Sequence, residues 1–264
     1  MIDIHSHILP YMDDGAKDWD MAIAMAKQAH ADGIRCIAAT PHHRNGRYIN
    51  DPSKVLEMVE ILNSKLQELH LDIKVFPGQE VRVHDDLLRH WEKGEILSLY
   101  GSRYVLLELP SSHIPATVED IVYELSLMDI RVIIAHPERN ADIARNPDRL
   151  LHLVELGALA QLTAQSVTGE KGGKLQRLSL DLCKRNLIHF IATDAHDPVR
   201  RPFQLTSSYQ VIEKKLGPEI VSYFKSNSKR VVDNLEIPIF DMTTHKVHGN
   251  VFAKVLSGMF RVTK

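Results

Sequence analysis

Short apolar runs alternate along the chain with longer stretches in which apolar residues recur at helical spacing. Each run is apolar throughout, as expected of parallel strands that are buried on both faces. The helical stretches carry start and stop signals: Asp18 can cap a helix that runs to about Asp32, and Pro52 follows Asp51 at the start of the next. The predicted strands are residues 1–4, 34–39, 73–76, 104–107, 131–135, 158–162 and 188–192.

Seven strands alternating with helices predict βα units around a parallel sheet, hence an α/β fold. A capping box from Thr117 to Asp120 predicts a helix over 121–128, and further helices are expected over 148–156, around 175–185 and twice after Pro202. A closed seven-stranded barrel fits the length, with an open doubly wound sheet as the alternative. We expect one domain over 1–235. The tail, residues 236–264, breaks the pattern and is expected either to pack on the barrel or to be partly disordered.

The composition indicates a globular protein and disfavours several functional classes. Among 264 residues, 44% are hydrophobic and 25% charged, which are globular values. The net charge of −2 disfavours a nucleic-acid binder. The two cysteines, Cys36 and Cys183, lie in apolar or helical patterns, which favours packing and a reducing compartment. Because no signal peptide and no apolar run of 18 residues is found, we predict a cytoplasmic protein without a membrane span.

The chain contains 15 histidines, and the informative point is where they fall. Active sites of parallel α/β folds form at the carboxyl ends of the strands. Six of the seven predicted strands end in, or are soon followed by, a histidine or a carboxylate, and only the sixth lacks an obvious ligand. These residues are His5 and His7, His42, Glu80, Glu108, His136, and Asp194 with His196.

Imidazole and carboxylate groups together suit Zn, Mn or Fe. Taken singly, each histidine reads as a hydrogen-bonded core or surface residue, and the His5-x-His7 pair alone is weak evidence. Glu108 is different, because a carboxylate that ends an apolar run must be paired or bound to metal. The coincidence of six strand ends therefore predicts a metal site on one face of the fold.

These residues also carry a resemblance. The sequence resembles the polymerase and histidinol phosphatase (PHP) superfamily, and within it the bacterial manganese-dependent protein-tyrosine phosphatases that act with capsule and exopolysaccharide tyrosine kinases. The resemblance spans roughly residues 1–235. Its motifs are Asp3-Ile-His-Ser-His-Ile-Leu-Pro10, Asp13-Asp-Gly15, Ala39-Thr-Pro-His-His43, Pro77-Gly-Gln-Glu-Val-Arg82, Leu107-Glu-Leu-Pro110, Ala135-His-Pro-Glu-Arg139 and Thr193-Asp-Ala-His196.

The resemblance implies a distorted (β/α)7 barrel that binds three metal ions, Mn²⁺ by analogy, although Fe or Zn would satisfy the same ligands. It adds Asp14, which in an Asp-Asp-Gly sequence otherwise indicates only a turn. Hydroxide that bridges the first two metals would attack phosphorus in line. The implied ligands are His5, His7, Glu80 and Asp194 for the first ion, Glu80, Glu108 and His136 for the second, and Asp14, His42 and His196 for the third.

Arginine adds a second argument, since a guanidinium can grip phosphate through two hydrogen bonds. The resemblance favours Arg139 and Arg201 as the phosphate clamp and leaves Arg200 open. A cysteine phosphatase is excluded, because the residues six positions after the two cysteines are His42 and His189 rather than arginine.

We therefore expect a metal-dependent protein-tyrosine phosphatase of capsule or exopolysaccharide regulation. As the resemblance implies, its substrate would be a phosphotyrosine protein, expected to be the tyrosine-rich tail of a bacterial tyrosine kinase. Two alternatives stay open. The chain could hydrolyse histidinol phosphate, a nucleic-acid end or another small phosphomonoester, or it could bind metal as a regulatory protein without turnover.

Overall fold

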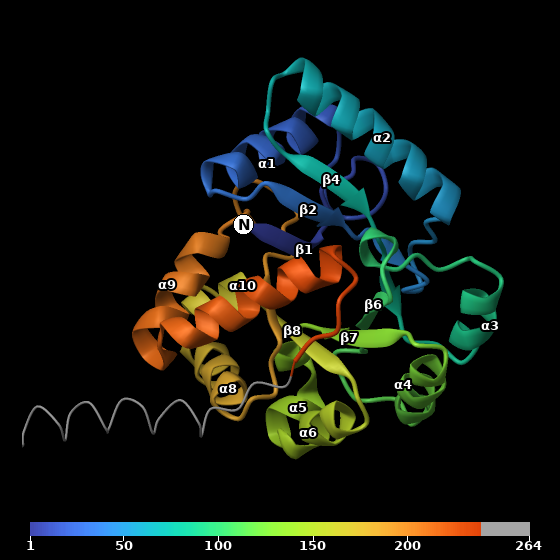
Figure 1. Ribbon diagram of the computed structural model, residues 1–264, viewed down its shortest axis with the longest axis vertical. Coiled ribbons are helices and arrows are strands. Elements are labelled where there is room, and N and C mark those ends of the chain that lie inside the picture. Colours follow the sequence, from blue (N-terminus) through green and yellow to red (C-terminus); the bar gives the residue numbers. More distant parts are fainter. Residues whose placement is uncertain (239–264) are drawn as a thin grey trace, which may run out of the picture.

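The computed structural model describes residues 1–238 and has the predicted alternation of strands and helices (Figure 1). All seven predicted strands are confirmed, and two short strands, β3 and β5, follow Pro41 and Gly78 and were not predicted. The strands are β1 (Ile2–Ser6), β2 (Cys36–Ala39), β3 (His42–His43), β4 (Lys74–Pro77), β5 (Glu80–Arg82), β6 (Tyr104–Glu108), β7 (Arg131–Ala135), β8 (Leu159–Thr163) and β9 (Phe190–Ala192).

The strands form two parallel sheets, one in the order β1-β2-β4 and one in the order β3-β5-β6-β7-β8-β9. A single bridge between Ser6 and Ala195 brings β1 beside the end of β9. The parallel α/β class is confirmed, but the predicted closure into one barrel is not, since no closed sheet is found among residues 1–238.

The division into two sheets has a local cause in the sequence. Pro41 follows β2 and has no N–H to donate to a ladder, and Gly78 follows β4. Each long strand is therefore broken into two pieces, so that β2 pairs with β4 in one sheet while β3 pairs with β5 in the other. The break is what delivers His42 and Glu80, which pair in register, to the start of the second sheet.

Helices cover the outer faces of both sheets, α1 and α2 on the smaller sheet and α4 against β7 of the larger one (Figure 1). Asp18 caps α1 as predicted, by accepting a hydrogen bond from the Met21 amide at 2.8 Å. The predicted capping box is wrong: Thr117 is already the first residue of α4, and no side chain caps that helix. The helices are α1 (Trp19–Ala31), α2 (Pro52–Glu68), α3 (Leu87–Glu92), α4 (Thr117–Leu127), α5 (Ala141–Arg145), α6 (Asp148–Glu155), α7 (Ala164–Thr168), α8 (Gly173–Lys184), α9 (Leu205–Leu216) and α10 (Pro218–Val232), with 3-10 turns at Leu99–Gly101 and Pro137–Arg139.

A small apolar cluster lies between the sheets and is separate from the larger core under the helices. It contains Ile4, Leu106 and Phe190, with Val231 of α10 and Ile237 packed against it. The first residues of the predicted tail therefore contact the fold, and the rest of the tail, residues 239–264, lies outside the described residues.

His189 joins β8 to β9 through its ring as well as its backbone. Its Nδ1 accepts a hydrogen bond from the Ala160 amide at 3.1 Å, and its own amide donates to the Ala160 carbonyl at 2.9 Å. Asn227 of α10 donates to the His189 carbonyl at 3.0 Å. Burial lowers the pKa of His189 to about 4, and an accepting Nδ1 requires a ring without a proton on that atom.

This histidine should make the fold sensitive to acid. Unfolded, His189 binds its proton near pH 6.5, and folded only near pH 4, so its stability contribution is complete above pH 6.5 and is lost as the pH falls toward 4. We expect the destabilisation caused by His189→Gln to be smaller at pH 4.5 than at pH 7.5 by about 2 to 3 kcal/mol, measured by urea unfolding. His152→Gln, an exposed histidine of α6, is the control. Equal destabilisation by His189→Gln at both pH values would contradict this account.

Candidate metal centre

The nine residues predicted as ligands converge on one face of the fold, although they span residues 5–196. Their imidazole nitrogens and carboxylate oxygens form overlapping groups in which all atoms lie within 4.8 Å of one another. Eight of the nine lie on or beside the strands that the sequence indicated, and Asp14 lies on the loop after β1. The groups are His7, Asp14, His42 and His196; His5, His7 and Glu80; His5, His136 and Asp194; and His42, Glu80 and Glu108.

Glu80 is at the centre of this cluster and is fully buried. Its Oε2 lies 3.4 Å from His5 Nε2, 3.3 Å from His7 Nε2 and 2.9 Å from His42 Nδ1. Its Oε1 lies 2.7 Å from His136 Nε2. Burial opposes ionisation, but His5 and His42 hold the pKa of the Glu80 carboxyl well below its usual range. Both oxygens of Glu80 therefore face histidine nitrogens on opposite sides.

Asp14 closes the opposite end of the cluster. One of its oxygens lies 3.5 Å from His42 Nε2 and 3.6 Å from His196 Nε2. The ring of His7 approaches those of His196 and His42, with centroids 3.8 and 4.6 Å apart. Burial, assisted by the charge of His7, lowers the pKa of His196 to about 2. His196 is thus held as a neutral imidazole, the form that binds metal.

Neighbouring side chains fix which nitrogen of each histidine faces the cluster. Gln161 Oε1 lies 2.9 Å from His5 Nδ1, and Asp13 Oδ2 lies 2.6 Å from His7 Nδ1. Both oxygens can only accept, so each Nδ1 carries a proton, and Nε2 is the nitrogen that is left to face the cluster. Although burial raises the pKa of Asp13, His7 holds that pKa far below its usual value, so Asp13 is ionised.

Sequence reasoning missed Gln161 and Asp13. Gln161 had a visible signal, because it is a polar residue in the otherwise apolar run of the sixth predicted strand, the one that lacked an obvious ligand. Asp13 had none, since Asp13-Asp14-Gly15 reads as an ordinary turn. The structure shows why Gly15 is needed there: a Cβ at this position would lie 2.1 Å from the His7 carbonyl oxygen.

Arg139 and Arg201 meet at the far oxygen of Asp194. Arg139 Nη1 lies 2.7 Å from Asp194 Oδ2, and Arg201 contacts the same oxygen. Despite its burial, Asp194 has a pKa held well below the usual range by these two guanidinium groups. Arg200, which the sequence left open, is exposed; its backbone amide donates to Asp197 and its backbone carbonyl accepts from Gln165. The structure therefore brings Arg201 rather than Arg200 to the cluster.

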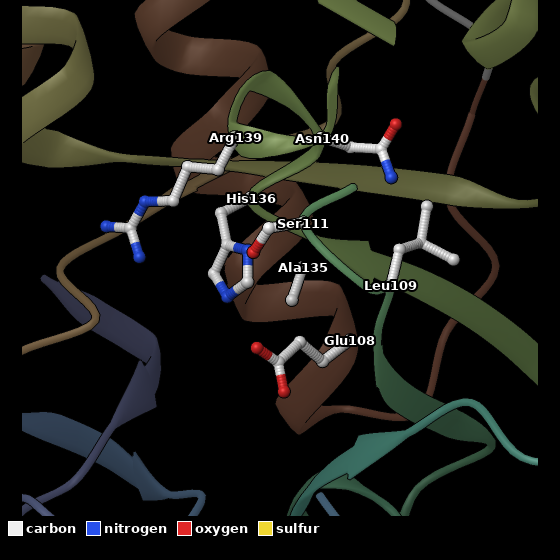
Figure 2. Close-up of a pocket in the computed structure, with 7 residues that line it drawn as sticks. All are labelled: Glu108, Leu109, Ser111, Ala135, His136, Arg139 and Asn140. Atoms are coloured by element: carbon white, nitrogen blue, oxygen red, sulfur yellow. The ribbon is translucent and has the colours of Figure 1, made fainter. Parts of the chain in front are cut away.

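Arg139 is supported from behind by a buried carboxylate. Glu138, which is 1% exposed, accepts hydrogen bonds from the amide and the hydroxyl of Thr163 at 3.1 and 2.9 Å. The Thr163 hydroxyl in turn accepts from Arg139 Nη2 at 3.3 Å. Glu108, His136 and Arg139 line a cavity of about 70 Å³. Figure 2 shows the ring of His136 between the side chains of Arg139 and Glu108.

Glu108 lies at the edge of the cluster, where its surroundings have opposing effects on the pKa of its carboxyl. Burial and the nearby Glu80 raise the pKa of its carboxyl. Arg82, in register with Glu108 on the neighbouring strand, places Nη2 2.9 Å from its Oε2 and favours the ionised form. From the sequence, Arg82 is expected either to support the site from outside or to lie on the surface, and in the structure it supports a carboxylate of the cluster.

Known proteins are similar to this chain in fold and in sequence. The sequence model of the capsular polysaccharide synthesis family CpsB/CapC matches residues 1–233. Tyrosine-protein phosphatase YwqE of Bacillus subtilis (strain 168) is 44% identical over 90% of this chain and 93% of that protein. Putative tyrosine-protein phosphatase CapC of Staphylococcus aureus is 40% identical over the same shares.

A solved structure agrees with the sequence comparison. It is described as a crystal structure of YwqE from Bacillus subtilis and CpsB from Streptococcus pneumoniae, metal-dependent tyrosine phosphatases. It superposes with a TM-score of 0.88 at 43% identity and covers 90% of this chain and 96% of that one. The resemblance found in the motifs is thereby confirmed, and the chain belongs to the CpsB/CapC family of capsular polysaccharide synthesis.

Proposed function

We propose that this protein is a metal-dependent tyrosine-protein phosphatase, which hydrolyses the phosphate ester of phosphotyrosine in proteins. One observation carries the proposal: nine histidine and carboxylate groups, Glu80 among them, converge in one cluster, with Arg139 and Arg201 beside them. The relatives named tyrosine-protein phosphatases, and the metal-dependent tyrosine phosphatase of similar fold, support the same activity.

The donor set fits divalent ions. His42 Nδ1 and Glu80 Oε2 are buried atoms without a hydrogen-bond partner in the part of the chain that the structure describes, whereas Glu108 Oε2 has the ion pair with Arg82. The first two lie only 2.9 Å apart, in an arrangement that gives neither a hydrogen bond. Unpaired polar atoms are costly to bury, and a cation between them would remove that cost.

We assign three ions, and Mn²⁺ as their identity, with Fe or Zn as the alternatives that the same ligands allow. Four carboxylates offset four of the six positive charges of three divalent ions, and the remainder suits a phosphate dianion. By the family resemblance, His5, His7, Glu80 and Asp194 would hold the first ion, Glu80, Glu108 and His136 the second, and Asp14, His42 and His196 the third. In the structure, His136 instead groups with His5 and Asp194, and His42 groups with Glu80 and Glu108 as well as with Asp14 and His196.

When bound, divalent ions would supply Lewis-acid chemistry, which activates water at neutral pH and neutralises charge on the phosphoryl group. The protein's own part is to bind and orient. Arg139 and Arg201 would grip the non-bridging oxygens of the phosphate, in the manner of charge-stabilising donors. The leaving phenol has a pKa near 10 and needs less protonation than an alkoxide, which suits a site without a dedicated general acid.

The finer proposals concern substrate and location. We propose the tyrosine-rich tail of a bacterial tyrosine kinase as the substrate and the cytoplasm as the compartment, on the strength of the family resemblance. Within residues 1–238, no helix has the length and apolar character needed to cross a membrane. The net charge of −2 argues against a nucleic-acid substrate. Hydrolysis of histidinol phosphate or another small phosphomonoester, and metal binding without turnover, are the rival functions.

Removal of metal should abolish activity reversibly. We expect chelator treatment to eliminate hydrolysis of para-nitrophenyl phosphate and added Mn²⁺ to restore it, with about three ions per chain by elemental analysis. Activity that is indifferent to both treatments would contradict the metal mechanism. Stoichiometric metal binding without turnover of any phosphoester would favour the regulatory alternative.

A substrate panel separates the phosphatase classes. With Mn²⁺ present, we expect a phosphotyrosine peptide to be hydrolysed with a higher kcat/KM than histidinol phosphate, because the phenol is the better leaving group. The matching phosphoserine peptide controls for peptide binding. Faster turnover of histidinol phosphate than of the phosphotyrosine peptide would exclude the substrate proposed.

Two substitutions test the residue roles. His136→Ala should abolish turnover, because it removes a nitrogen that lies 2.7 Å from Glu80.

Arg139→Ala should lower kcat/KM on the order of 10² to 10³ while leaving the bound metal in place. Arg145→Ala, an exposed arginine of α5, is the matched control and should have wild-type kinetics. Wild-type kinetics in Arg139→Ala would remove this residue from the phosphate clamp.

A further inference from the structure

Three large apolar side chains are exposed on loops that carry residues of the metal centre. Tyr11, on the loop that carries Asp14, is 67% exposed. Ile49, on the loop after His42, is 65% exposed, and Val199, three residues after His196, is 84% exposed. Exposed apolar residues are ordinary when scattered singly, but these three lie on loops that each begin at or near a histidine of the metal centre.

The three loops meet at the centre itself. The histidines at or near their bases, His7, His42 and His196, have ring centroids 3.8 to 6.2 Å apart. The other large apolar residues that are exposed within residues 1–238 lie elsewhere, on helices α2 and α4, next to them, or near residue 235. They are Leu56, Leu69, Tyr123, Leu127, Met128 and Leu235.

The loop of Tyr11 is held in a fixed shape. The Tyr11 amide donates to the Ala16 carbonyl at 3.2 Å, and the Ala16 amide donates to the His7 carbonyl at 3.1 Å. Tyr11 has a φ of 64°, a left-handed conformation that costs free energy in a residue other than glycine. The loop therefore presents Tyr11 to solvent at a conformational cost.

In the other two loops, side-chain oxygens accept hydrogen bonds from backbone amides and hold the loop conformation. Asn45 Oδ1 accepts hydrogen bonds from the amides of Arg47 and Tyr48 at 3.1 and 2.9 Å, directly before Ile49. Asp197 Oδ1 accepts from the Val199 amide at 2.8 Å. Rigid presentation lowers the entropy that a bound partner must overcome.

We propose that Tyr11, Ile49 and Val199, the apolar rim, bind the polypeptide segment that carries the phosphotyrosine, through the apolar residues next to the phosphotyrosine. The inference rests on the proposed function and names its substrate surface. An occupant of this rim has to leave the centre accessible, which a substrate segment does by inserting its phosphate. A second copy of the chain seated on the rim would obstruct entry.

The test compares a peptide with a substrate that lacks neighbouring residues. For each protein, kcat/KM is measured with Mn²⁺ for a phosphotyrosine peptide with flanking leucines and for free phosphotyrosine, and the ratio of the two is taken. A triple variant, Tyr11→Asn, Ile49→Ser and Val199→Ser, should lower that ratio on the order of 30-fold, mostly through KM. Asparagine is chosen because it tolerates the left-handed backbone at position 11.

The matched control is Tyr123→Ser with Leu127→Ser on α4, which are 54% and 65% exposed in the wild-type chain. This control should keep the wild-type ratio. Melting temperatures show whether the variants are folded. If the triple variant is not folded, the single variants Ile49→Ser and Val199→Ser replace it in the test, and each is expected to lower the ratio about threefold.

Three outcomes would contradict the proposed role of the apolar rim in binding the substrate segment. The first is an unchanged ratio in the folded triple variant, and the second is an equal fall in the α4 control. The third is a change of oligomeric state, by light scattering, without a change in the ratio, which would mark the rim as a contact between copies. Failure of the wild-type protein to hydrolyse either phosphotyrosine substrate would instead refute the proposed function.

Discussion

The structure depends on one electrostatic constraint, the complete burial of the Glu80 carboxylate. An isolated buried carboxylate would take up a proton rather than remain charged, but here histidines face both oxygens and keep its pKa low. Those histidines come from separate strands, so the charge is compensated only when the whole fold has assembled. The arrangement of the centre and the packing of the strands around Glu80 therefore depend on each other.

The chain reaches this arrangement by interrupting its own strands. At Pro41 the backbone lacks an amide hydrogen, and the chain passes from one sheet to the other, as it also does at Gly78. His42 and Glu80 then begin short strands at the mouth of the second sheet. A continuous strand would have placed these side chains in a different register and on a different sheet. The same interruption explains why the hydrogen-bonded ladder does not close on itself.

Sequence reasoning recovered what depends on periodicity and on position at a strand end. Apolar runs located seven strands, and the residues after them located eight of the nine groups; Asp14 came only from the family resemblance. What the sequence could not supply depends on contacts far apart in the chain. The two residues of β3 carry no periodic signal. The failed capping box at Thr117 has a similar cause, since a motif of the right residues needs an extended cap that the entering backbone does not provide.

Asp194 shows how the two halves of the site are held in a fixed relation. Its Oδ1 lies 3.4 Å from His5 Nε2 and 3.3 Å from His7 Nε2, while its Oδ2 receives Arg139 and Arg201. One carboxylate thus joins the histidine side to the arginine side, and its backbone is held in the left-handed region at a φ of 54°. Because the two oxygens of a carboxylate are at a fixed separation, a movement of Asp194 would shift its contacts with the histidines and with the arginines together. The position at which a phosphate would be gripped is therefore set by the same residue that helps to define the metal centre.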